Sequence, residues 1–323
     1  MHAWIGHGFG PPESLSFEEV KDRALNEGEA RLALRACGIN FADALLVAGQ
    51  YQVKPDPPFT PGFEVAGEVV ESREPALPVG ARVVSTLDGV GGYATHAIAF
   101  KATTHLIPDA MPFDDAAALT VTYQTGWFGL YRRARLQAGE TLLVHAAAGG
   151  VGSAAVQLGK AAGARVIATA GGPDKVALCK ALGADLAIDY KAGDFVKAVN
   201  DATDGRGADV IYDPVGGDVF DRSTKCIAFE GRLIVVGFAS GRIPQARANH
   251  LLVKNYSVVG LHWGLYQFRA PELIAAAQLE LFALYRQGKI KPHISERIPL
   301  KDAPAALSRV AKGGTVGKVV LVP

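Results

Sequence analysis

Cysteine is scarce in this chain, and the few cysteines that occur are far apart. There are three, Cys37, Cys179 and Cys226, which is an odd number without close spacing. This pattern argues against a disulfide framework and is typical of a protein in a reducing compartment. The cytoplasm is therefore the expected location.

Long apolar runs and an excess of charge of one sign are also absent. No stretch of about 18 uninterrupted apolar residues is available to span a bilayer. Residues 1–7 lack the basic region and apolar run of a signal peptide. The 33 basic residues nearly balance the 32 acidic ones, so the chain has no electrostatic footprint for nucleic acid or for an anionic membrane. These absences predict a soluble globular protein with neither nucleic acid nor membrane as a partner.

What is present changes in character along the chain, and 323 residues are too many for one ordinary core. The first hundred residues alternate charged and apolar side chains in segments such as 31–36 and 63–71, a pattern typical of half-exposed strands. Further strands are expected near 80–84 and 91–96. This half of the chain is predicted to be a small β-rich domain.

From about residue 114 helices and short apolar strands alternate. The strands are expected at 142–146, 165–170, 186–189, 208–213, 232–237 and 257–260, and the helices at 114–119, 122–133, 194–203 and 220–229. A long helix follows at 272–287, and a last strand at 318–322 is expected to return to the first domain. The predicted fold is α/β, with a β-rich domain and a doubly wound parallel sheet.

A glycine turn lies at the centre of this organisation. The strand 142–146 leads into the spacing Ala146-x-x-Gly149-x-x-Gly152, and a helix and a second strand at 165–170 follow. Gly149 and Gly150 allow a sharp turn and a close approach of backbone N–H groups to a pyrophosphate, and Gly152 allows the helix to pack on the strand. In that helix Val151, Ala155, Leu158 and Ala162 are expected to face inward, and Ser153, Gln157 and Lys160 outward. The pattern predicts a dinucleotide site.

The end of the second strand indicates which dinucleotide. Enzymes that use NAD usually place Asp or Glu there to hold the ribose 2′-hydroxyl, whereas this strand ends Thr169-Ala170-Gly171-Gly172. Lys175 follows in the turn and Tyr190 follows the third strand, and both could contact a 2′-phosphate. Lys175 could equally be a solvated lysine at a helix start. The missing acid favours NADPH over NADH.

The chain resembles the medium-chain dehydrogenase/reductase superfamily, and within it the zinc-free quinone oxidoreductase branch, also called zeta-crystallin-like. The resemblance rests on segments 37–43 (Cys-Gly-Ile-Asn-Phe-Ala-Asp), 61–67 (Pro-Gly-Phe-Glu-Val-Ala-Gly), 139–152 and 317–321. It implies a GroES-like catalytic domain at 1–118, an inserted Rossmann NADP-binding domain at 119–262, and a return to the catalytic domain at 263–323. It also implies NADPH in the cleft between the domains, and commonly a homodimer in which segment 257–260 pairs sheet edges.

The resemblance bears on metal binding, because zinc alcohol dehydrogenases belong to the same superfamily. A cysteine ligand of those enzymes would fall at Asn40 here, and a histidine ligand at Phe63. Phenylalanine has no lone pair, and Cys37 lies three positions away from the ligand site, so it is better interpreted as a small core residue. The closely spaced cysteines of a structural zinc lobe are absent too. No metal is expected.

The implied activity is zinc-independent reduction of quinones by direct hydride transfer from NADPH. By family position Asn40 and Tyr51 would line the acceptor pocket, and Asp43 would support their loop. Tyr51 falls where related enoyl-thioester reductases carry a proton-donating tyrosine, but it could also only stack against the ring, and Asn40 could be a left-handed turn residue. The predicted cofactor contacts are Thr125, Ala148, Gly149, Gly150, Val151, Gly152, Thr169, Lys175, Tyr190, Gly237, Phe238, Ala239, Ser240 and Lys318.

Two other functions stay open at this stage. One is reduction of enoyl-thioesters or of other α,β-unsaturated carbonyls, with Tyr51 as the proton donor. The other is a non-enzymatic role, such as an NADPH-bound scaffold or an RNA-binding protein, against which the balanced charge argues. The small-molecule acceptor itself cannot be chosen from the sequence, because loop shape decides it.

Overall fold

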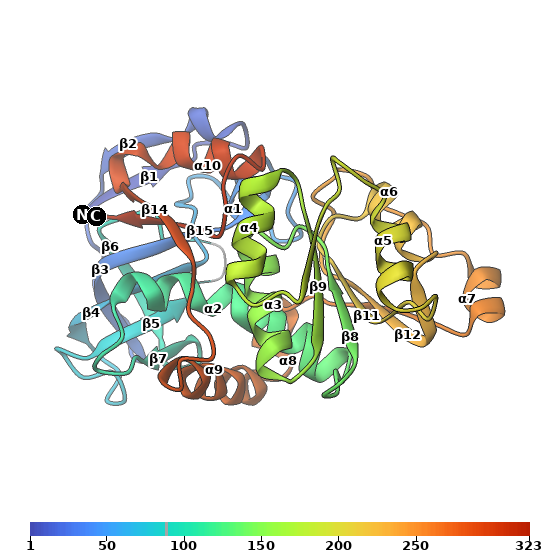
Figure 1. Cartoon of the computed structure of the whole chain (residues 1–323). Coiled ribbons are helices and arrows are strands. Elements are labelled where there is room, and N and C mark those ends of the chain that lie inside the picture. The colour runs from blue at the N-terminus through green and yellow to red at the C-terminus, as the bar shows by residue number, and fades with distance from the viewer. Residues whose placement is uncertain (88–89) are drawn as a thin grey trace. The chain divides into compact units, whose positions relative to one another are not determined.

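The structure is a computed structural model that describes residues 1–87 and 90–323. The chain forms two compact units (Figure 1). Unit 1 consists of 1–121, 270–282 and 292–323, and unit 2 of 122–269 and 283–291. The segments follow the same order as the proposed division at 118 and 262, with segment 283–291 assigned to unit 2. No described helix has both the length and the apolar character that a membrane span requires.

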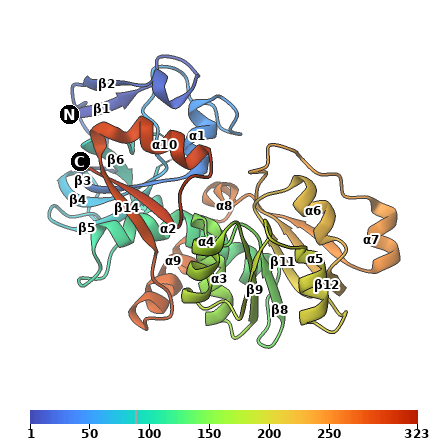
Figure 2. The same ribbon diagram turned by 45° about the horizontal axis from the view of Figure 1, so that its top comes forward.

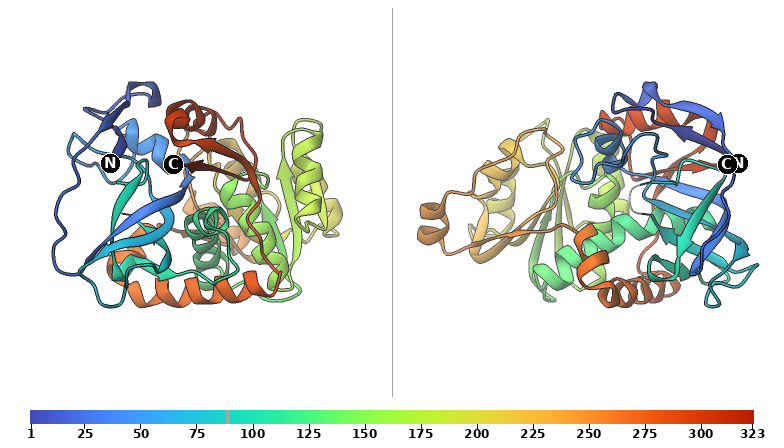
Figure 3. Two further views of the ribbon diagram at one scale, coloured as in Figure 1. Left: turned by 90° about the vertical axis from the view of Figure 1, so that its left-hand side faces the viewer. Right: turned by 180° about the vertical axis from the view of Figure 1, so that it is seen from behind.

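Unit 1 contains a seven-stranded sheet in the order β14-β15-β3-β4-β5-β7, with β6 paired to β3, and a separate pair, β1 and β2. The predicted return of the last strand is confirmed, because β15 pairs antiparallel with β3 through Val319 and Ile39; Figure 3 shows the red strand beside the blue one. The strands are β1 (His2–Ile5), β2 (Ser16–Glu19), β3 (Glu29–Ile39), β4 (Glu64–Ser72), β5 (Arg82–Thr86), β6 (His96–Phe100), β7 (Thr104–Leu106), β14 (Ile294–Pro299) and β15 (Lys318–Val322).

Two predictions for unit 1 were wrong. Strand β3 is buried along almost its whole length rather than half-exposed, because β15, β4 and β6 all pair with it. Even Arg31 is buried there, where it binds Glu71 and Asp22. The strand expected at 91–96 begins only at His96, because Gly91 has a φ of 110°, a left-handed conformation that a strand does not adopt.

Unit 2 is built on a six-stranded parallel sheet in the order β10-β9-β8-β11-β12-β13. Numbered within the unit this order is 3-2-1-4-5-6, the arrangement of doubly wound dinucleotide-binding folds. Helices α3 and α4 lie on one face of the sheet, and α5 and α6 on the other (Figures 1 and 2). The strands are β8 (Thr141–Val144), β9 (Arg165–Ala170), β10 (Leu186–Asp189), β11 (Ala208–Asp213), β12 (Ile227–Val235) and β13 (Ser257–Gly260).

The predicted helices are present with two differences, whereas the helices at 41–47, 248–254, 264–269 and 303–311 were not predicted. The helix expected at 220–229 is α6 and ends at Ser223, because Ile227 already pairs with Ala208 in the sheet. Helix α3 is buried on nearly every side, so the expected outward positions Ser153 and Gln157 are buried as well. The helices are α1 (Phe41–Val47), α2 (Phe113–Trp127), α3 (Gly150–Ala161), α4 (Pro173–Ala181), α5 (Phe195–Ala202), α6 (Gly217–Ser223), α7 (Ala248–Lys254), α8 (Gly264–Arg269), α9 (Pro271–Arg286) and α10 (Ala303–Ala311), with a π-helix at Phe128–Arg133 after α2.

Polar groups explain the burial of Gln157. Its side-chain Nε2 donates to the Tyr123 hydroxyl at 2.8 Å and to the Lys291 carbonyl at 3.0 Å, and its Oε1 accepts from the Lys291 N–H at 2.7 Å. A buried amide with three such bonds is satisfied without water. Residue type alone therefore misplaced this side chain, because its partners lie far away in the sequence.

Candidate functional site

The glycine turn of unit 2 lies between β8 and α3. Gly149 is the extended residue before the helix, with φ −85° and ψ 178°. A Cβ on Gly152 would lie closer to the Ala146 carbonyl oxygen than real contacts allow. Ala146 itself has a φ of 47°, so the backbone turns sharply at that point. The Gly149 N–H donates to the Ala146 carbonyl at 2.9 Å. The first N–H groups of a helix have no acceptor within it, and those of Gly150, Val151 and Gly152 therefore remain for an anion.

The carboxyl end of β9 carries no acid, as the sequence predicted. Gly171 lies against Tyr190, since a Cβ on Gly171 would be 2.6 Å from the tyrosine hydroxyl. Lys175 is half-buried in the first turn of α4. The sequence interpretation missed Asp189 at the end of β10, whose Oδ1 accepts the Gly172 N–H at 3.0 Å; this bond is the main cause of its lowered pKa. That carboxylate also accepts the Lys191 N–H at 2.9 Å, so it joins the turn after β9 to the turn that carries Tyr190.

Thr169 belongs to a buried polar cluster of unit 2. Its hydroxyl lies 2.9 Å from Nδ1 of His145, and Nε2 of this histidine lies 2.8 Å from the Ser223 hydroxyl. Burial lowers the pKa of His145 to about 3, so the imidazole is neutral. The cluster joins β8, β9 and α6, and it accounts for the Thr169 side chain without a cofactor.

The other predicted cofactor contacts of unit 2 lie on one loop and one helix. Loop 237–240 follows β12 and binds the loop after β11, where the N–H groups of Ala239 and Ser240 donate to the carbonyls of Pro214 and Val215 at 3.1 and 2.9 Å. Both loops therefore lie at the carboxyl ends of neighbouring parallel strands, where doubly wound folds bind ligands. Thr125 is a buried residue of α2 in unit 2.

In unit 1 the predicted acceptor residue Asn40 is part of a buried network. Its side-chain Nδ2 donates to Gly38 O at 3.2 Å and to Glu64 Oε1 at 3.0 Å, and its Oδ1 accepts from the Lys318 ammonium at 2.8 Å. Both amide hydrogens are therefore engaged within the unit. The backbone is extended with φ −123°, so the left-handed alternative is wrong.

Lys318 is 3% exposed and donates three hydrogen bonds. Its Nζ lies 2.6 Å from Glu64 Oε1, 2.8 Å from Asn40 Oδ1 and 3.0 Å from the Ile39 carbonyl. An ammonium has three N–H donors, so these contacts account for the lysine without a cofactor. The other Glu64 oxygen accepts the Val121 N–H of α2 at 2.7 Å. The sequence interpretation gave no role to Glu64, although it follows Phe63 in a quoted motif.

Asp43 supports the same loop, as the family resemblance implies. Its Oδ2 accepts the Asn40 N–H at 2.7 Å and the Tyr93 hydroxyl at 3.2 Å, whereas its buried Oδ1 has no partner in the described part of the chain. Burial raises the pKa of Asp43 from 3.8 to about 7 against these bonds and against the attraction of Lys318. No sequence motif identified Tyr93 as its partner.

Tyr51 lies at the edge of this region. Its ring packs edge-on against Phe63, with centroids 5.2 Å apart. It is half-buried, and no partner for its hydroxyl occurs within residues 1–87 and 90–323. Burial raises its pKa, and the charge of Asp43 adds to the shift. Of the two predicted acceptor residues, Tyr51 is the one with a side-chain donor still available.

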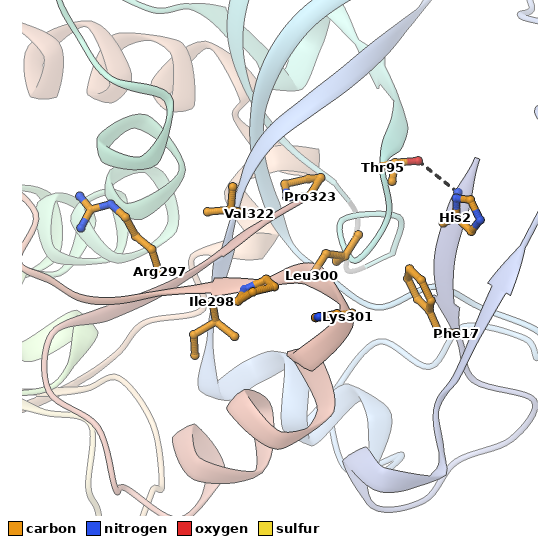
Figure 4. Close-up of a pocket in the computed structure, with 10 residues that line it drawn as sticks. His2, Phe17, Thr95, Arg297, Ile298, Leu300, Lys301, Val322 and Pro323 are labelled. Carbon is orange, nitrogen blue, oxygen red and sulfur yellow. Dashed lines mark hydrogen bonds between the residues drawn. The ribbon is translucent and has the colours of Figure 1, made fainter.

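Two further features of unit 1 bear on ligand binding: its potential metal ligands and a surface pocket. Within the described ranges, no cluster of three or more His, Cys, Asp or Glu side chains is arranged to hold a metal ion. A shallow pocket of about 530 Å³ is lined by Phe17, Arg297, Leu300 and their neighbours (Figure 4). It contains none of the predicted site residues, and Arg297 there is paired with Asp114.

Comparison with known proteins matches both units to one superfamily. Residues 26–109 match the alcohol dehydrogenase GroES-like domain, and residues 150–278 match the zinc-binding dehydrogenase family. Among curated proteins, the quinone oxidoreductase-like protein 2 homolog of Nematostella vectensis is 42% identical over 92% of this chain and 82% of its own length. The quinone oxidoreductase of Pseudomonas aeruginosa is 35% identical over 98% of this chain and 97% of its own.

Solved structures agree with this assignment. The Escherichia coli quinone oxidoreductase complexed with NADPH superposes with a TM-score of 0.93 at 31% identity, over 100% of both chains. The CurK enoyl reductase has a TM-score of 0.89 at 27% identity, over 99% of this chain and 98% of its own. The chain belongs to the quinone oxidoreductases of the medium-chain dehydrogenase/reductase superfamily. Its α/β fold, a GroES-like domain with a Rossmann-like parallel sheet, is that of the family.

Proposed function

We propose that this protein reduces quinones with NADPH by direct hydride transfer and without zinc. The observation that carries the proposal is the glycine turn at the start of α3, together with an acid-free end of β9 where Lys175 and Tyr190 lie. The related enzymes named as quinone oxidoreductases, one of them complexed with NADPH, support the same assignment.

The residues of unit 2 fit NADPH. The N–H groups that open α3 suit a pyrophosphate, since a side chain on Gly152 would collide with the Ala146 carbonyl. The Lys175 ammonium and the Tyr190 hydroxyl suit the 2′-phosphate. Loop 237–240 and Thr125 would approach the nicotinamide. When bound, NADPH supplies a hydride from C4 of its nicotinamide ring.

The residues of unit 1 do not fit the zinc ion of zinc-binding dehydrogenases. Phe63 has no lone pair, and Asn40 has both amide hydrogens and its oxygen engaged. The Lys318 ammonium lies beside Asn40 and Glu64, and its positive charge would oppose a dication there. The donor set therefore gives zinc no ligands of the usual kind.

Without a Lewis acid, an electron-poor π system is the acceptor that is easiest to reduce. A quinone accepts hydride directly, so the protein has only to align it and to supply one hydrogen bond to the oxygen that gains charge. Tyr51 is the donor we assign to this oxygen, because its hydroxyl is not engaged elsewhere among the described residues. Asn40 then shapes the pocket rather than donating to the acceptor.

Reduction of an α,β-unsaturated carbonyl is the second candidate. It is favoured by the same Tyr51 hydroxyl, which could protonate the carbon next to the carbonyl, and by the likeness to an enoyl reductase. In that reaction Tyr51→Phe should stop turnover, whereas quinone reduction should continue at a lower rate, because a quinone needs no strong protein acid.

Stopped-flow oxidation of NADPH and NADH tests the proposal. The purified protein is mixed with 1,4-benzoquinone, 9,10-phenanthrenequinone or crotonyl-CoA, with and without EDTA. Fast turnover of a quinone with NADPH, unchanged by EDTA, is the expected result. Turnover of crotonyl-CoA alone would move the assignment to enoyl reduction, and loss of activity with EDTA would overturn the zinc-independent mechanism.

Two further parts of the proposal concern assembly and location. Strand β13 is the last strand of the parallel sheet, and its outer edge pairs with no strand among the described residues. Helix α7, which precedes it in the chain, exposes Leu252 and Val253. A homodimer that pairs two β13 edges would cover them, and light scattering measures its mass. The buried, free thiols of Cys37, Cys179 and Cys226 suit a cytoplasmic protein.

A further inference from the structure

The buried ion pair of unit 1 joins strands β15 and β4, and both of its members also bind Asn40. Lys318 lies on the last strand, β15, and Glu64 begins β4; their charged atoms are 2.6 Å apart, with exposures of 3% and 0%. A buried pair of this kind is weak evidence for stability, because desolvation of both charges offsets most of their attraction. Its position suggests a second role.

The first step from the ion pair leads to Asn40. The amide of Asn40 is fixed in one orientation, since its oxygen accepts from the Lys318 ammonium and its nitrogen donates to the Glu64 carboxylate. The backbone N–H of the same residue donates to Asp43 at 2.7 Å. This bond satisfies one of the free donors at the start of α1. The ion pair therefore fixes Asn40, the residue immediately before α1.

The second step leads along α1 to Tyr51. The Leu45 carbonyl in α1 accepts two N–H groups from beyond the helix, that of Gln50 at 2.8 Å and that of Tyr51 at 3.1 Å. The backbone of Tyr51 is thus held by the helix that Asn40 and Asp43 start. A displacement of Asn40 would be passed to Tyr51 through one helix of seven residues.

A second route reaches the ring of the same tyrosine. Glu64 follows Phe63 directly, and Tyr51 packs edge-on against the Phe63 ring. The Glu64 carboxylate is held by Lys318 on one oxygen and by the Val121 N–H on the other. The backbone of Tyr51 is therefore connected to the Lys318–Glu64 pair through α1 and Asn40, and its ring is connected to the same pair through Phe63.

We propose that Lys318 and Glu64 are positioning residues for Tyr51 and so set how the acceptor is held. This inference rests on the proposed function and deepens it, because it names the residues behind the acceptor side of the site. Neither residue touches the acceptor; both act through Asn40, α1 and Phe63. The competing explanation is that the pair only holds β15 onto the sheet, in which case its loss would lower stability and leave the geometry of Tyr51 unchanged.

Matched variants separate the two explanations. Lys318→Met and Glu64→Gln each remove one charge at nearly constant size. Glu29→Gln is the control, because Glu29 is also buried in unit 1 and paired, with Arg23 at 2.7 Å, but contacts none of the residues above. Steady-state rates with 9,10-phenanthrenequinone, NADPH affinity by fluorescence titration, and thermal unfolding are measured for all variants.

We expect kcat/KM for the quinone to fall about tenfold or more in Lys318→Met and Glu64→Gln, an amount that corresponds to about 1.4 kcal/mol. NADPH affinity should stay within about twofold, because the residues assigned to NADPH above lie in unit 2, and the three donors of Lys318, a predicted cofactor contact, are all engaged within unit 1. Glu29→Gln should lower the unfolding temperature and leave kcat/KM within about twofold. Equal kcat/KM in the ion-pair variants and the control would overturn the proposal.

A second variant covers the case in which the charge variants fail to fold. Asn40→Ala leaves Lys318 paired with Glu64 and removes the side-chain amide that links this pair to the start of α1, together with its bond to the Gly38 carbonyl. It is expected to fold and to reduce kcat/KM in the same direction. A value equal to that of the wild type would contradict the route through α1.

A spectroscopic measurement decides the inference independently of turnover. The nine tyrosines are labelled with 3-fluorotyrosine, and the Tyr51 signal is assigned with Tyr51→Phe. A shifted or broadened Tyr51 signal in Asn40→Ala, absent in Glu29→Gln, supports the positioning role, and an unchanged signal overturns it. A wild-type protein that reduces no quinone would refute the proposed function, and this signal would still decide the inference.

Discussion

The two units differ in the groups that they offer for binding. Unit 2 offers backbone: a glycine turn, the N–H groups that open α3, and two loops at the ends of parallel strands. Unit 1 offers buried charged and polar side chains whose partners lie up to 279 positions away along the chain. A backbone site tolerates no added side chain, whereas a side-chain network depends on charge balance. Substitutions in unit 2 should therefore act mainly on cofactor affinity, and loss of one charge in unit 1 should act mainly on stability.

The largest effect on cofactor affinity is expected for the backbone site. Gly152→Val places a branched side chain against the Ala146 carbonyl. The turn must therefore open, and the N–H groups at the start of α3 no longer point toward the pyrophosphate. NADPH affinity should fall roughly hundredfold, about 2.8 kcal/mol, as measured by fluorescence titration. Gly193→Ala is the control in the same unit, because nothing lies within 4 Å of a Cβ there. Equal affinity in Gly152→Val and wild type would remove the distinction between the units.

The next effect concerns charge balance in unit 1. Lys318→Met leaves the Glu64 carboxylate buried without its cation, which typically lowers the free energy of unfolding by about 3–5 kcal/mol. Lys160→Met breaks a partly exposed pair with Asp185 in unit 2, for which about 0–1 kcal/mol is usual. Urea denaturation measures both. The double variant Glu64→Gln/Lys318→Met should lose less than the two single losses added together; additive losses would show that the pair is not coupled.

The same contrast explains how far the sequence could lead. Strands 165–170, 186–189, 208–213 and 257–260 were predicted within the observed bounds, because each is a short, mainly apolar run between turns. The glycine turn could be predicted because its requirement, the absence of a Cβ, is a property of single residues. Both signals are local.

The unit 1 network could not be predicted, because each member is defined by a distant partner. Lys318 was interpreted as a cofactor contact, and Glu64 and Tyr93 received no role, although the three lie in or beside one buried cluster. Asn40 was expected to serve the acceptor, yet its amide is engaged by Lys318 and Glu64. A residue type does not state which charge will lie next to it after folding, and family position supplied Asn40 and Tyr51 without supplying their contacts.

A further prediction for unit 1 concerns Asp43, whose ionisation should make the stability of the protein depend on pH. Burial raises its pKa to about 7 from 3.8, a difference of roughly 4 kcal/mol at 1.36 kcal/mol for each pKa unit. Between these pH values the folded protein binds more protons at Asp43 than the unfolded chain does. Its contribution to stability is therefore largest below about pH 4, falls as pH rises to about 7, and is constant above that.

Asp43→Asn tests this sign. The variant lacks the titrating group and keeps an oxygen that can accept from Asn40 and Tyr93. Between pH 5 and pH 8 the free energy of unfolding of the wild type should therefore fall relative to that of the variant. Chemical denaturation at both pH values measures the difference, and Lys318 and Glu64, which also face Asp43, are unchanged in both proteins. A difference that is constant with pH would mean that Asp43 is ionised throughout.

The smallest effect is expected where unit 2 does use a side chain. Lys175→Ala removes one cation from the first turn of α4, so the affinity for NADPH should fall about tenfold, about 1.4 kcal/mol, and that for NADH should not change. Lys180→Ala, on an exposed position of the same helix, is the control and should change neither. If Lys175→Ala weakened both cofactors equally, the lysine would act on the shared part of the dinucleotide or on the turn held by Asp189. The preference for NADPH would then rest only on the absence of an acidic residue at the end of β9. Like the glycine turn before α3, that end of the strand would then act through its backbone and not through a charged side chain.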